Sequence, residues 1–311
     1  MTKLPPFRTG KPRLEKGHIR ATDDLEIPFA VIEGAQEGPR LLVTAGVHGS
    51  EFCSIEAALR LTKIPPRNLQ GTLVVLPILN MQGFMRRSIY VMPQDGKNLN
   101  RVFPGKADGT ASERLAEWLV TEVYPQVDAY LDLHGGDLDE SLVPFSLYPN
   151  GSEASLELAS AFGLSIAVTA GGEGYTINAA HKIGVPGIIA EVSGNGLWDD
   201  KTVGELTTGV ERVMKHLGMI SGPVKPAPQE RPQVVKMWVP QAPVSGLWYP
   251  AKELSEPVAA GEALGEIRDV FGEVLATMPS QESGFILYRL TSLSVNKGEA
   301  LLGVATPAAE K

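Results

Sequence analysis

The sequence predicts an α/β protein in which helices flank a mixed sheet, followed by a small C-terminal β domain. Three observations lead to this prediction. Between about residues 20 and 220, apolar runs of strand length alternate with helical segments. Residues 222–232 contain four prolines among eleven residues, which is typical of a linker. Shorter strands and glycine turns follow. We therefore expect an α/β domain at 1–221, a linker at 222–232 and a β domain at 233–311.

The individual elements follow from length and periodicity. Short aliphatic runs bounded by turn residues predict buried strands at 41–47, 73–79, 129–133 and 188–192. Longer segments with apolar residues at helical spacing predict helices at 50–61, 112–123, 153–161 and 202–217. Strands that alternate with helices in this way are typical of a largely parallel or mixed sheet whose faces are covered by helices.

Composition narrows the class of protein. The chain has 311 residues, 43% of them hydrophobic and 21% charged, as in globular enzymes. Its net charge of −8 argues against a nucleic-acid partner. No apolar run approaches the roughly 18 residues of a membrane span, and the N-terminus lacks the apolar core of a signal peptide. The single cysteine, Cys53, is expected to be a small core residue rather than a nucleophile. We expect a cytoplasmic protein.

Two histidines and one glutamate form the first candidate site. His48 and Glu51 lie three residues apart, where the predicted strand 41–47 gives way to a predicted helix. At such a junction, two side chains with this spacing can converge on one ion. His134 follows the predicted strand 129–133 and precedes two glycines. Two nitrogens and one carboxylate, with a fourth position left open, are the donor set of a catalytic zinc site and indicate metal-assisted hydrolysis.

An acidic residue accompanies the second histidine. Asp132 lies two residues before His134 and can orient a metal-bound imidazole. Alternation along the strand does not show which ligand the Asp132 side chain faces. The alternative is an ordinary polar residue at the end of a strand.

A second group of polar residues lies in the loop 95–105, which glycines and a proline punctuate. Asn100 and Arg101 place an amide beside a guanidinium, a pairing that suits a planar carboxylate. Arg86 and Arg87 precede this loop, and one of them can polarise a scissile carbonyl. The alternative is that Arg86 and Arg87 form a solvated basic pair.

Glu191 is the third candidate. It lies near the end of the predicted strand 188–192, and a buried, unpaired glutamate is costly unless it has a partner or a task. Beside a metal, Glu191 can take a proton from the attacking water and pass it to the leaving nitrogen. The alternative is a salt-bridged residue at the edge of the sheet.

In combination, these residues resemble a known family. The ordered set resembles the succinylglutamate desuccinylase/aspartoacylase family, a branch of the zinc carboxypeptidase superfamily, over roughly residues 25 to 220. The motifs that carry the resemblance are His48-x-x-Glu51, Asn98-Leu-Asn-Arg101, Asp132-Leu-His134 and Glu191. The resemblance implies a carboxypeptidase-like mixed sheet with its site at the strand ends. It also implies one Zn²⁺ per chain, held by His48, Glu51 and His134, with Glu191 as general base and acid.

The same resemblance implies roles for the loop residues. Asn100 and Arg101 match the clamp for a substrate carboxylate, and Arg87, or Arg86, matches the arginine that polarises the carbonyl. Asn98 departs from the family pattern, which often has an aspartate at this position.

The function expected from this resemblance is the zinc-dependent removal of a short acyl group from an N-acyl amino acid or related N-acyl amine. The substrate would be a small molecule bearing a carboxylate. Two alternatives remain open: a metallocarboxypeptidase that acts on small peptides, and a non-catalytic module that binds metal or ligand. The sequence leaves open the acyl group and the metal used in the cell. It also leaves open the oligomeric state, for which a homo-oligomer is one possibility.

The C-terminal part contains an internal repeat. Its sequence around Gly246 and Gly261 is echoed around Gly284 and Gly298, at offsets of 38 and 37 residues. Two similar β units predict a small pseudo-symmetric barrel or sandwich, closed by pairing of the halves. This part resembles the biotinyl/lipoyl-like, or barrel-sandwich, fold. Because it lacks the lysine motifs of cofactor attachment, we expect a structural module that walls the mouth of the active site or forms a subunit interface.

Overall fold

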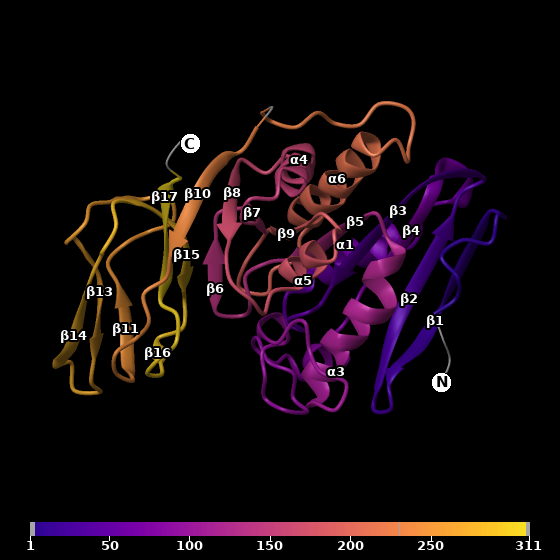
Figure 1. Cartoon of the computed structure of the whole chain (residues 1–311). Helices are drawn as coiled ribbons and strands as arrows, with labels where there is room; N and C mark the ends of the chain where they lie inside the picture. The colour runs from indigo at the N-terminus through magenta and orange to yellow at the C-terminus, as the bar shows by residue number, and fades with distance from the viewer. Residues whose placement is uncertain (1–3, 230, 309–311) are drawn as a thin grey trace.

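The main sheet of the protein is mixed, and its central strands run parallel. The computed structural model describes residues 4–229 and 231–308. Parallel pairing joins β4 to β3, β3 to β5 and β5 to β9, and antiparallel strands flank this centre (Figure 1). In sheet order, the first eight strands are β1 (Arg13–Thr22), β2 (Leu25–Glu33), β4 (Gln70–Leu76), β3 (Gln36–Ala45), β5 (Ala129–His134), β9 (Gly187–Glu191), β7 (Phe145–Pro149) and β8 (Ile166–Ala170). The α/β class with a mixed sheet is confirmed.

Helices cover both faces of this sheet. One face packs against α1 (Phe52–Leu61), α4 (Glu153–Phe162) and α6 (Asp200–His216). The other packs against α3 (Ala111–Trp118) and α5 (Thr176–Lys182). Each buried strand contributes side chains to the hydrophobic core on both faces of the sheet, because successive side chains point to opposite faces. In β5, for example, Leu131 and Leu133 pack on the face covered by α1, α4 and α6, and Tyr130 packs on the other face.

Several predicted boundaries are wrong by a few residues; the strand predicted at 73–79, for example, is Gln70–Leu76. The strand predicted at 41–47 begins earlier, at Gln36, and ends at Ala45. It ends there because Gly46 has a φ of +62°, a left-handed conformation that glycine adopts without strain and that turns the chain. The helix predicted at 112–123 is regular only to Trp118 and continues as a wider π-helical turn over Leu119–Val123.

Cys53 lies buried in α1, where burial raises the pKa of its thiol to about 11, as expected of a core residue.

The C-terminal strands continue the main sheet. Strand β10 (Gln233–Trp238) pairs with β8 on one side and β17 (Leu302–Pro307) on the other, and β15 (Gly284–Leu290) and β12 (Pro257–Val258) follow. Strand β6 (Glu140–Leu142) pairs with β15, so the two parts of the chain are joined at a second place. Residues 222–229 and 231–232 form neither helix nor strand. The domain boundaries at 221 and 233 stay predictions.

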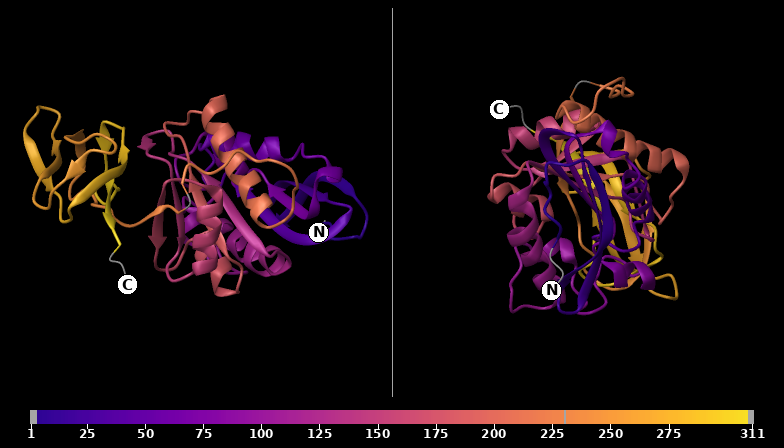
Figure 2. Two further views of the ribbon diagram at one scale, coloured as in Figure 1. Left: turned by 90° about the horizontal axis from the view of Figure 1, so that it is seen from above. Right: turned by 90° about the vertical axis from the view of Figure 1, so that its right-hand side faces the viewer.

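A second sheet completes the C-terminal part, at the end of the molecule opposite β1 (Figures 1 and 2). Its order is β14 (Val274–Pro279), β13 (Ala263–Arg268), β11 (Gly246–Pro250) and β16 (Ser294–Val295). The repeats pair reciprocally: Gly246 lies opposite Val295, and Gly284 lies opposite Val258. The predicted small β domain is thus present, and each repeat pairs with a strand of the other repeat. Its barrel-sandwich type stays a prediction.

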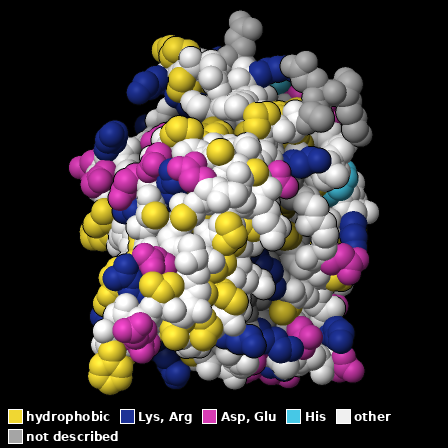
Figure 3. Space-filling view, turned by 90° about the vertical axis from the view of Figure 1, so that its left-hand side faces the viewer, with side chains coloured by type: hydrophobic (Ala, Val, Ile, Leu, Met, Phe, Trp, Pro, Cys, Tyr) yellow, Lys and Arg dark blue, Asp and Glu magenta, His cyan; other side chains and the backbone are white. Residues whose placement is uncertain are grey.

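The outer face of the C-terminal part carries exposed apolar side chains. Figure 3 shows hydrophobic groups distributed among charged ones on this end of the molecule. Phe271 is 89% exposed, and Val270, Val274 and Leu293 are also exposed. A homo-oligomer stays a prediction. Among the described residues, no helix is both long enough and apolar enough to cross a membrane.

Candidate active site

The candidate residues meet at the carboxyl ends of three neighbouring parallel strands. His48 and Glu51 lie in the turn that connects β3 to α1, His134 ends β5, and Glu191 ends β9. His134 and Glu191 are directly paired in the register of β5 and β9. Open α/β sheets place ligands outside the carboxyl ends of their strands because the connecting loops diverge there. The fold therefore brings residues from three distant segments of the chain to one place.

A glycine allows the turn between β3 and α1 to pack closely against helix α2 (Met81–Arg86). A Cβ atom at Gly49 would lie 2.1 Å from the backbone nitrogen of Phe84 and 2.2 Å from the carbonyl carbon of Gly83. Neither backbone atom can move away as a flexible side chain could. Gly49 is therefore required for this packing, which fixes the backbone between His48 and Glu51.

The three predicted metal ligands form a buried cluster. Each of His48, Glu51 and His134 offers one ligand atom, and these atoms all lie within 4.8 Å of one another. The Nδ1 atom of His48 is 2.6 Å from Oε1 of Glu51, and Nδ1 of His134 is 3.0 Å from Oε2 of Glu51. Both imidazoles thus direct the same type of nitrogen toward the carboxylate.

This donor set fits a bound cation. His134 is 1% exposed, and its Nδ1 atom forms no hydrogen bond with any described residue. Burial raises the pKa of Glu51, but the neighbouring histidines outweigh burial and lower it to about 2. Burial lowers the pKa of His134, but the Glu51 and Asp132 carboxylates outweigh burial and raise it well above its usual value. The cluster therefore favours a positive charge between its ligands, which a divalent metal ion would supply.

Each histidine has a polar partner on the side away from Glu51. The Nε2 atom of His134 lies 3.1 Å from a carboxylate oxygen of Asp132, and Nε2 of His48 lies 3.1 Å from Oδ1 of Asn98. Asp132 is itself held by hydroxyl groups of Thr44 and Thr176, at 2.6 and 2.7 Å. Such contacts fix the orientation of metal-binding imidazoles. The position at which the chain departs from the family pattern, Asn98, is therefore a partner of His48.

Glu191 lies at the edge of this cluster. Its Oε1 atom is 3.9 Å from Nδ1 of His134. Burial raises the pKa of Glu191 well above its usual value; His134 lowers it, but nearby carboxylates, including Glu51, raise it further. A carboxyl group with a raised pKa can both accept and return a proton near neutral pH, as a general base and acid must.

The predicted carboxylate clamp is ordered by neighbouring groups. Oδ1 of the buried Asn100 accepts a hydrogen bond of 2.9 Å from the backbone N–H of Thr176, so its Nδ2 group is the donor it can offer. Arg101 donates to the carbonyl of Asn100 at 2.8 Å, and its guanidinium lies 4.6 Å from the centre of the Tyr175 ring. Arg101 is exposed and forms no ion pair within the described chain. Its charge is therefore available to a substrate.

The two upstream arginines lie at the end of α2. Arg86 is the last residue of this helix and Arg87 caps it, with a left-handed φ of 55°. Both side chains are exposed, and neither forms an ion pair among the described residues. The structure thus leaves both available, and the role predicted for Arg87, or for Arg86, stays a prediction.

Three further residues around the cluster were not predicted. The ring of Tyr90 packs edge-on against His48, with centroids 5.6 Å apart. The Asp137 carboxylate accepts the backbone N–H of Tyr90 at 2.8 Å, which fixes this loop. Tyr288, from β15, lies opposite Leu142 of β6. Burial raises its pKa, Glu140 raises it further and Arg101 lowers it.

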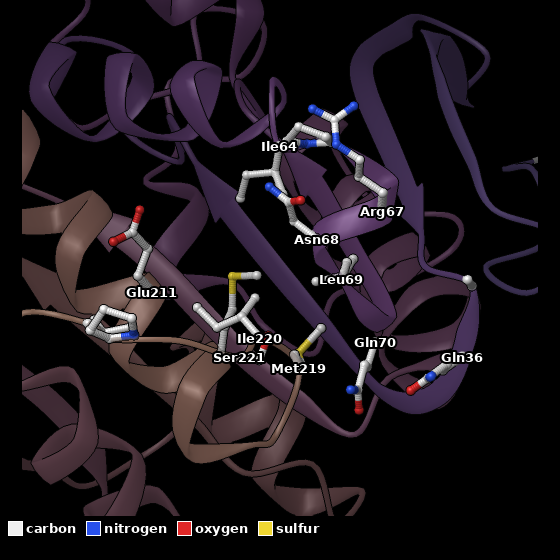
Figure 4. A pocket seen from close by; sticks show the side chains of 15 residues that line it. Gln36, Ile64, Arg67, Asn68, Leu69, Gln70, Glu211, Met219, Ile220 and Ser221 are labelled. Atoms are coloured by element: carbon white, nitrogen blue, oxygen red, sulfur yellow. The ribbon is translucent and has the colours of Figure 1, made fainter.

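A separate pocket lies at the amino ends of strands in the main sheet, opposite the carboxyl ends that carry the candidate site (Figure 4). It has a volume of about 550 Å³, and its lining includes Gln36 and Gln70, which begin β3 and β4. Arg67 and Glu211 are the charged side chains among its lining residues. Because it lies at the amino ends of these strands, this pocket is remote from the metal cluster.

Comparison with known proteins agrees with this geometry. Residues 37–217 match the model of the succinylglutamate desuccinylase/aspartoacylase catalytic domain. The chain is 28% identical, over 90% of its own length and 85% of the relative's, to N-alpha-acetyl-L-2,4-diaminobutyric acid deacetylase of Halomonas elongata. It is 25% identical to a succinylglutamate desuccinylase/aspartoacylase crystal structure from Rhodobacter sphaeroides, with a TM-score of 0.82 and coverage of 96% and 97%. The product-bound ectoine utilisation protein EutE (DoeB) of Ruegeria pomeroyi shares the fold, with a TM-score of 0.84, 23% identity and coverage of 95% and 96%.

Proposed function

Because the chain belongs to the succinylglutamate desuccinylase/aspartoacylase family, we propose that it is a zinc-dependent amidohydrolase. It removes a short acyl group from an N-acyl amino acid or a related N-acyl amine. The observation that carries this proposal is the buried cluster of His48, Glu51 and His134, with Glu191 3.9 Å from one of its ligand atoms. The relative from Halomonas elongata, an N-acetyl amino acid deacetylase by name, supports the same class of reaction.

The ligands in this proposal are Nδ1 of His48, the Glu51 carboxylate and Nδ1 of His134, which would hold one Zn²⁺ per chain. A zinc ion held there would act as a Lewis acid toward the acyl carbonyl. Asp132 lies 3.1 Å from Nε2 of His134, and Asn98 lies 3.1 Å from Nε2 of His48, so each imidazole has a polar neighbour that favours its orientation.

Proton transfer is assigned to Glu191. Its carboxylate accepts a proton from the attacking water at the edge of the cluster and later donates this proton to the leaving nitrogen. The raised pKa of Glu191, caused by burial and by nearby carboxylates, makes its carboxylate a stronger base toward the attacking water than an exposed glutamate.

Substrate binding is assigned to the exposed cation and the ordered amide beside the cluster. Arg101 pairs with a substrate carboxylate, and Nδ2 of Asn100 donates a second hydrogen bond to it. Arg87, or Arg86, assists in polarising the carbonyl. A small carboxylate-bearing molecule satisfies these groups without a long peptide.

Substituting Arg101 tests the clamp. Arg101→Lys keeps the charge but loses the planar fork, so we expect KM to rise by about tenfold or more, with a smaller change in kcat. The matched control is Arg231→Lys, an exposed arginine whose contact with Glu153 is 3.9 Å. Steady-state kinetics on an N-acyl amino acid measures both constants. An unchanged KM in Arg101→Lys would remove Arg101 from the clamp.

An assay on matched substrates tests the reaction class. The zinc-loaded protein is given N-acetyl and N-succinyl amino acids, including Nα-acetyl-2,4-diaminobutyrate, and dipeptides with the same C-terminal residues. Release of free amine from the N-acyl amino acids alone supports the deacylase proposal. Preferential cleavage of the dipeptides would favour a metallocarboxypeptidase. Bound zinc without any turnover would favour the non-catalytic binding module.

A further inference from the structure

A short segment, residues 174–176, lies between the two halves of the proposed site and leads into helix α5. One half is the metal cluster with its neighbour Asp132. The other half is the loop of residues 98–103, which carries Asn100 and Arg101 and which we call the clamp loop. The distance between the metal and the clamp decides where the acyl carbonyl of a bound substrate lies relative to the metal. A segment that contacts both halves can fix this distance.

Thr176 contacts both halves directly. Its hydroxyl donates to Oδ2 of Asp132 at 2.7 Å, and a carboxylate oxygen of Asp132 lies 3.1 Å from Nε2 of His134. The backbone N–H of Thr176 donates to Oδ1 of Asn100 at 2.9 Å. All four residues are buried, and in the interior a lost hydrogen-bond partner is costly. One residue therefore joins the neighbour of a predicted metal ligand to the predicted clamp.

Gly174 holds the clamp loop through its backbone. Its carbonyl accepts a hydrogen bond of 3.3 Å from the N–H of Phe103, and the two residues form an isolated β-bridge. A Cβ atom at Gly174 would lie 2.7 Å from the carbonyl oxygen of Arg101 and 2.9 Å from its carbonyl carbon. The φ of Gly174 is +98°, which only glycine adopts readily. This close approach to the clamp loop therefore requires a glycine.

We propose that Gly174 and Thr176 are positioning residues that hold the clamp loop at a fixed distance from the metal cluster. Gly174 acts on the clamp side, through close backbone packing against Arg101. Thr176 acts on the metal side as well, because its hydroxyl ties the segment to Asp132. The inference rests on the proposed deacylase function and deepens it, because it assigns residues that set the geometry between metal and clamp.

Gly174→Ala tests the clamp side. The added Cβ must push the carbonyl of Arg101 away. At saturating zinc we therefore expect KM to rise about tenfold or more, with a smaller change in kcat, for the N-acyl amino acid cleaved fastest in the assay on matched substrates. The zinc Kd, measured by competition with a chelator, should change less than about threefold, because the hydroxyl of Thr176 is unaltered.

Gly172→Ala is the matched control for this substitution. Gly172 also has a left-handed φ, of +85°, so alanine brings a similar backbone strain there. A Cβ atom at Gly172 would have no other atom within 4 Å, so it would not press on the clamp loop. We expect wild-type KM and wild-type zinc Kd for this variant.

Thr176→Val tests the metal side. It removes the hydroxyl but keeps the backbone N–H, so Asp132 loses a donor while Asn100 keeps its partner. Partners of metal-binding histidines typically contribute about 10- to 100-fold to metal affinity, so we expect the zinc Kd to rise about tenfold. KM at saturating zinc should change less than about threefold. Thr176→Ser, which keeps a hydroxyl, should bind zinc nearly as tightly as wild type. Thr207→Val, in α6, is the matched control.

Two results would overturn the inference. The first is an unchanged KM in Gly174→Ala, or an equal rise in Gly172→Ala, which would trace the effect to backbone strain. The second is a wild-type zinc Kd in Thr176→Val, or a weakened Kd that Thr176→Ser does not restore. If the Tm of metal-free Gly174→Ala shows that this variant does not fold, the zinc Kd of the two Thr176 variants decides.

The zinc measurement also separates this inference from the proposed function, because it needs no turnover. If no acyl substrate is hydrolysed but Thr176→Val weakens zinc binding and Thr176→Ser restores it, the deacylase proposal fails and the role of Thr176 stands. If N-acyl amino acids are hydrolysed and neither Gly174→Ala nor Thr176→Val has its expected effect, the function stands and the inference fails. A wild-type protein that binds no zinc would overturn both.

Discussion

Glu191→Gln is expected to lower kcat by about 10²- to 10⁴-fold while the protein stays folded and keeps its metal. Glutamine has the same shape as glutamate but cannot accept a proton from water or return one to the leaving nitrogen. Glu191 lies beside the cluster rather than among the residues whose ligand atoms meet within 4.8 Å, so its loss should spare zinc binding. Steady-state kinetics together with metal analysis of the same preparation measures both effects.

A matched control separates this effect from a general loss of charge. Glu157→Gln makes the same change on the exposed face of α4, and wild-type turnover is expected for it. If Glu191→Gln also retained wild-type kcat, proton transfer would belong to another group and the proposed mechanism would be removed. Loss of zinc in Glu191→Gln would instead make Glu191 a metal ligand.

Much of the fold could be predicted because its signals are local. The runs that became β3, β5 and β9 are aliphatic and short, as strands buried on both faces must be. Their exact ends depend on non-local contacts that periodicity does not report. The close packing of Gly49 against Gly83 and Phe84 is one example, because it joins a turn to a helix about 30 residues later in the chain.

The site was predictable where one short motif carried the chemistry. His48 and Glu51 share a turn, and His134 ends a recognisable strand, so their convergence followed from the order of the elements. Alternation along the strand does not show which ligand the Asp132 side chain faces. The structure answers this question, because a carboxylate oxygen of Asp132 lies 3.1 Å from Nε2 of His134.

The remaining groups could not be predicted because their neighbours are distant in sequence. Glu140 starts a strand of three residues, which is too short for a periodic signal. Tyr288 lies opposite Leu142 only because β15 pairs with β6, a contact between residues about 150 positions apart. The two alternatives for the C-terminal part, a wall of the active-site mouth or a subunit interface, both stay predictions.

His134→Ala is expected to reduce bound zinc from about one ion per chain to nearly none after dialysis. The substitution removes one of the two nitrogen ligands and leaves the Asp132 carboxylate without its imidazole partner. Mass spectrometry of metal content measures the loss. The matched control is His181→Ala, an exposed histidine of α5, which should keep its zinc.

A thermal measurement distinguishes loss of the ligand from loss of the fold. Zinc at about 100 times its Kd should stabilise the wild-type protein by about 2.7 kcal/mol and raise its Tm, because the ion binds only the folded state. The Tm of His134→Ala should be the same with and without zinc and should lie close to that of chelator-treated wild type. If the variant kept its zinc, another residue would complete the site. If the wild-type protein bound no zinc even when zinc was supplied, the favourable geometry of His48, Glu51 and His134 would not make a metal centre, and the amidohydrolase proposal would fall with it.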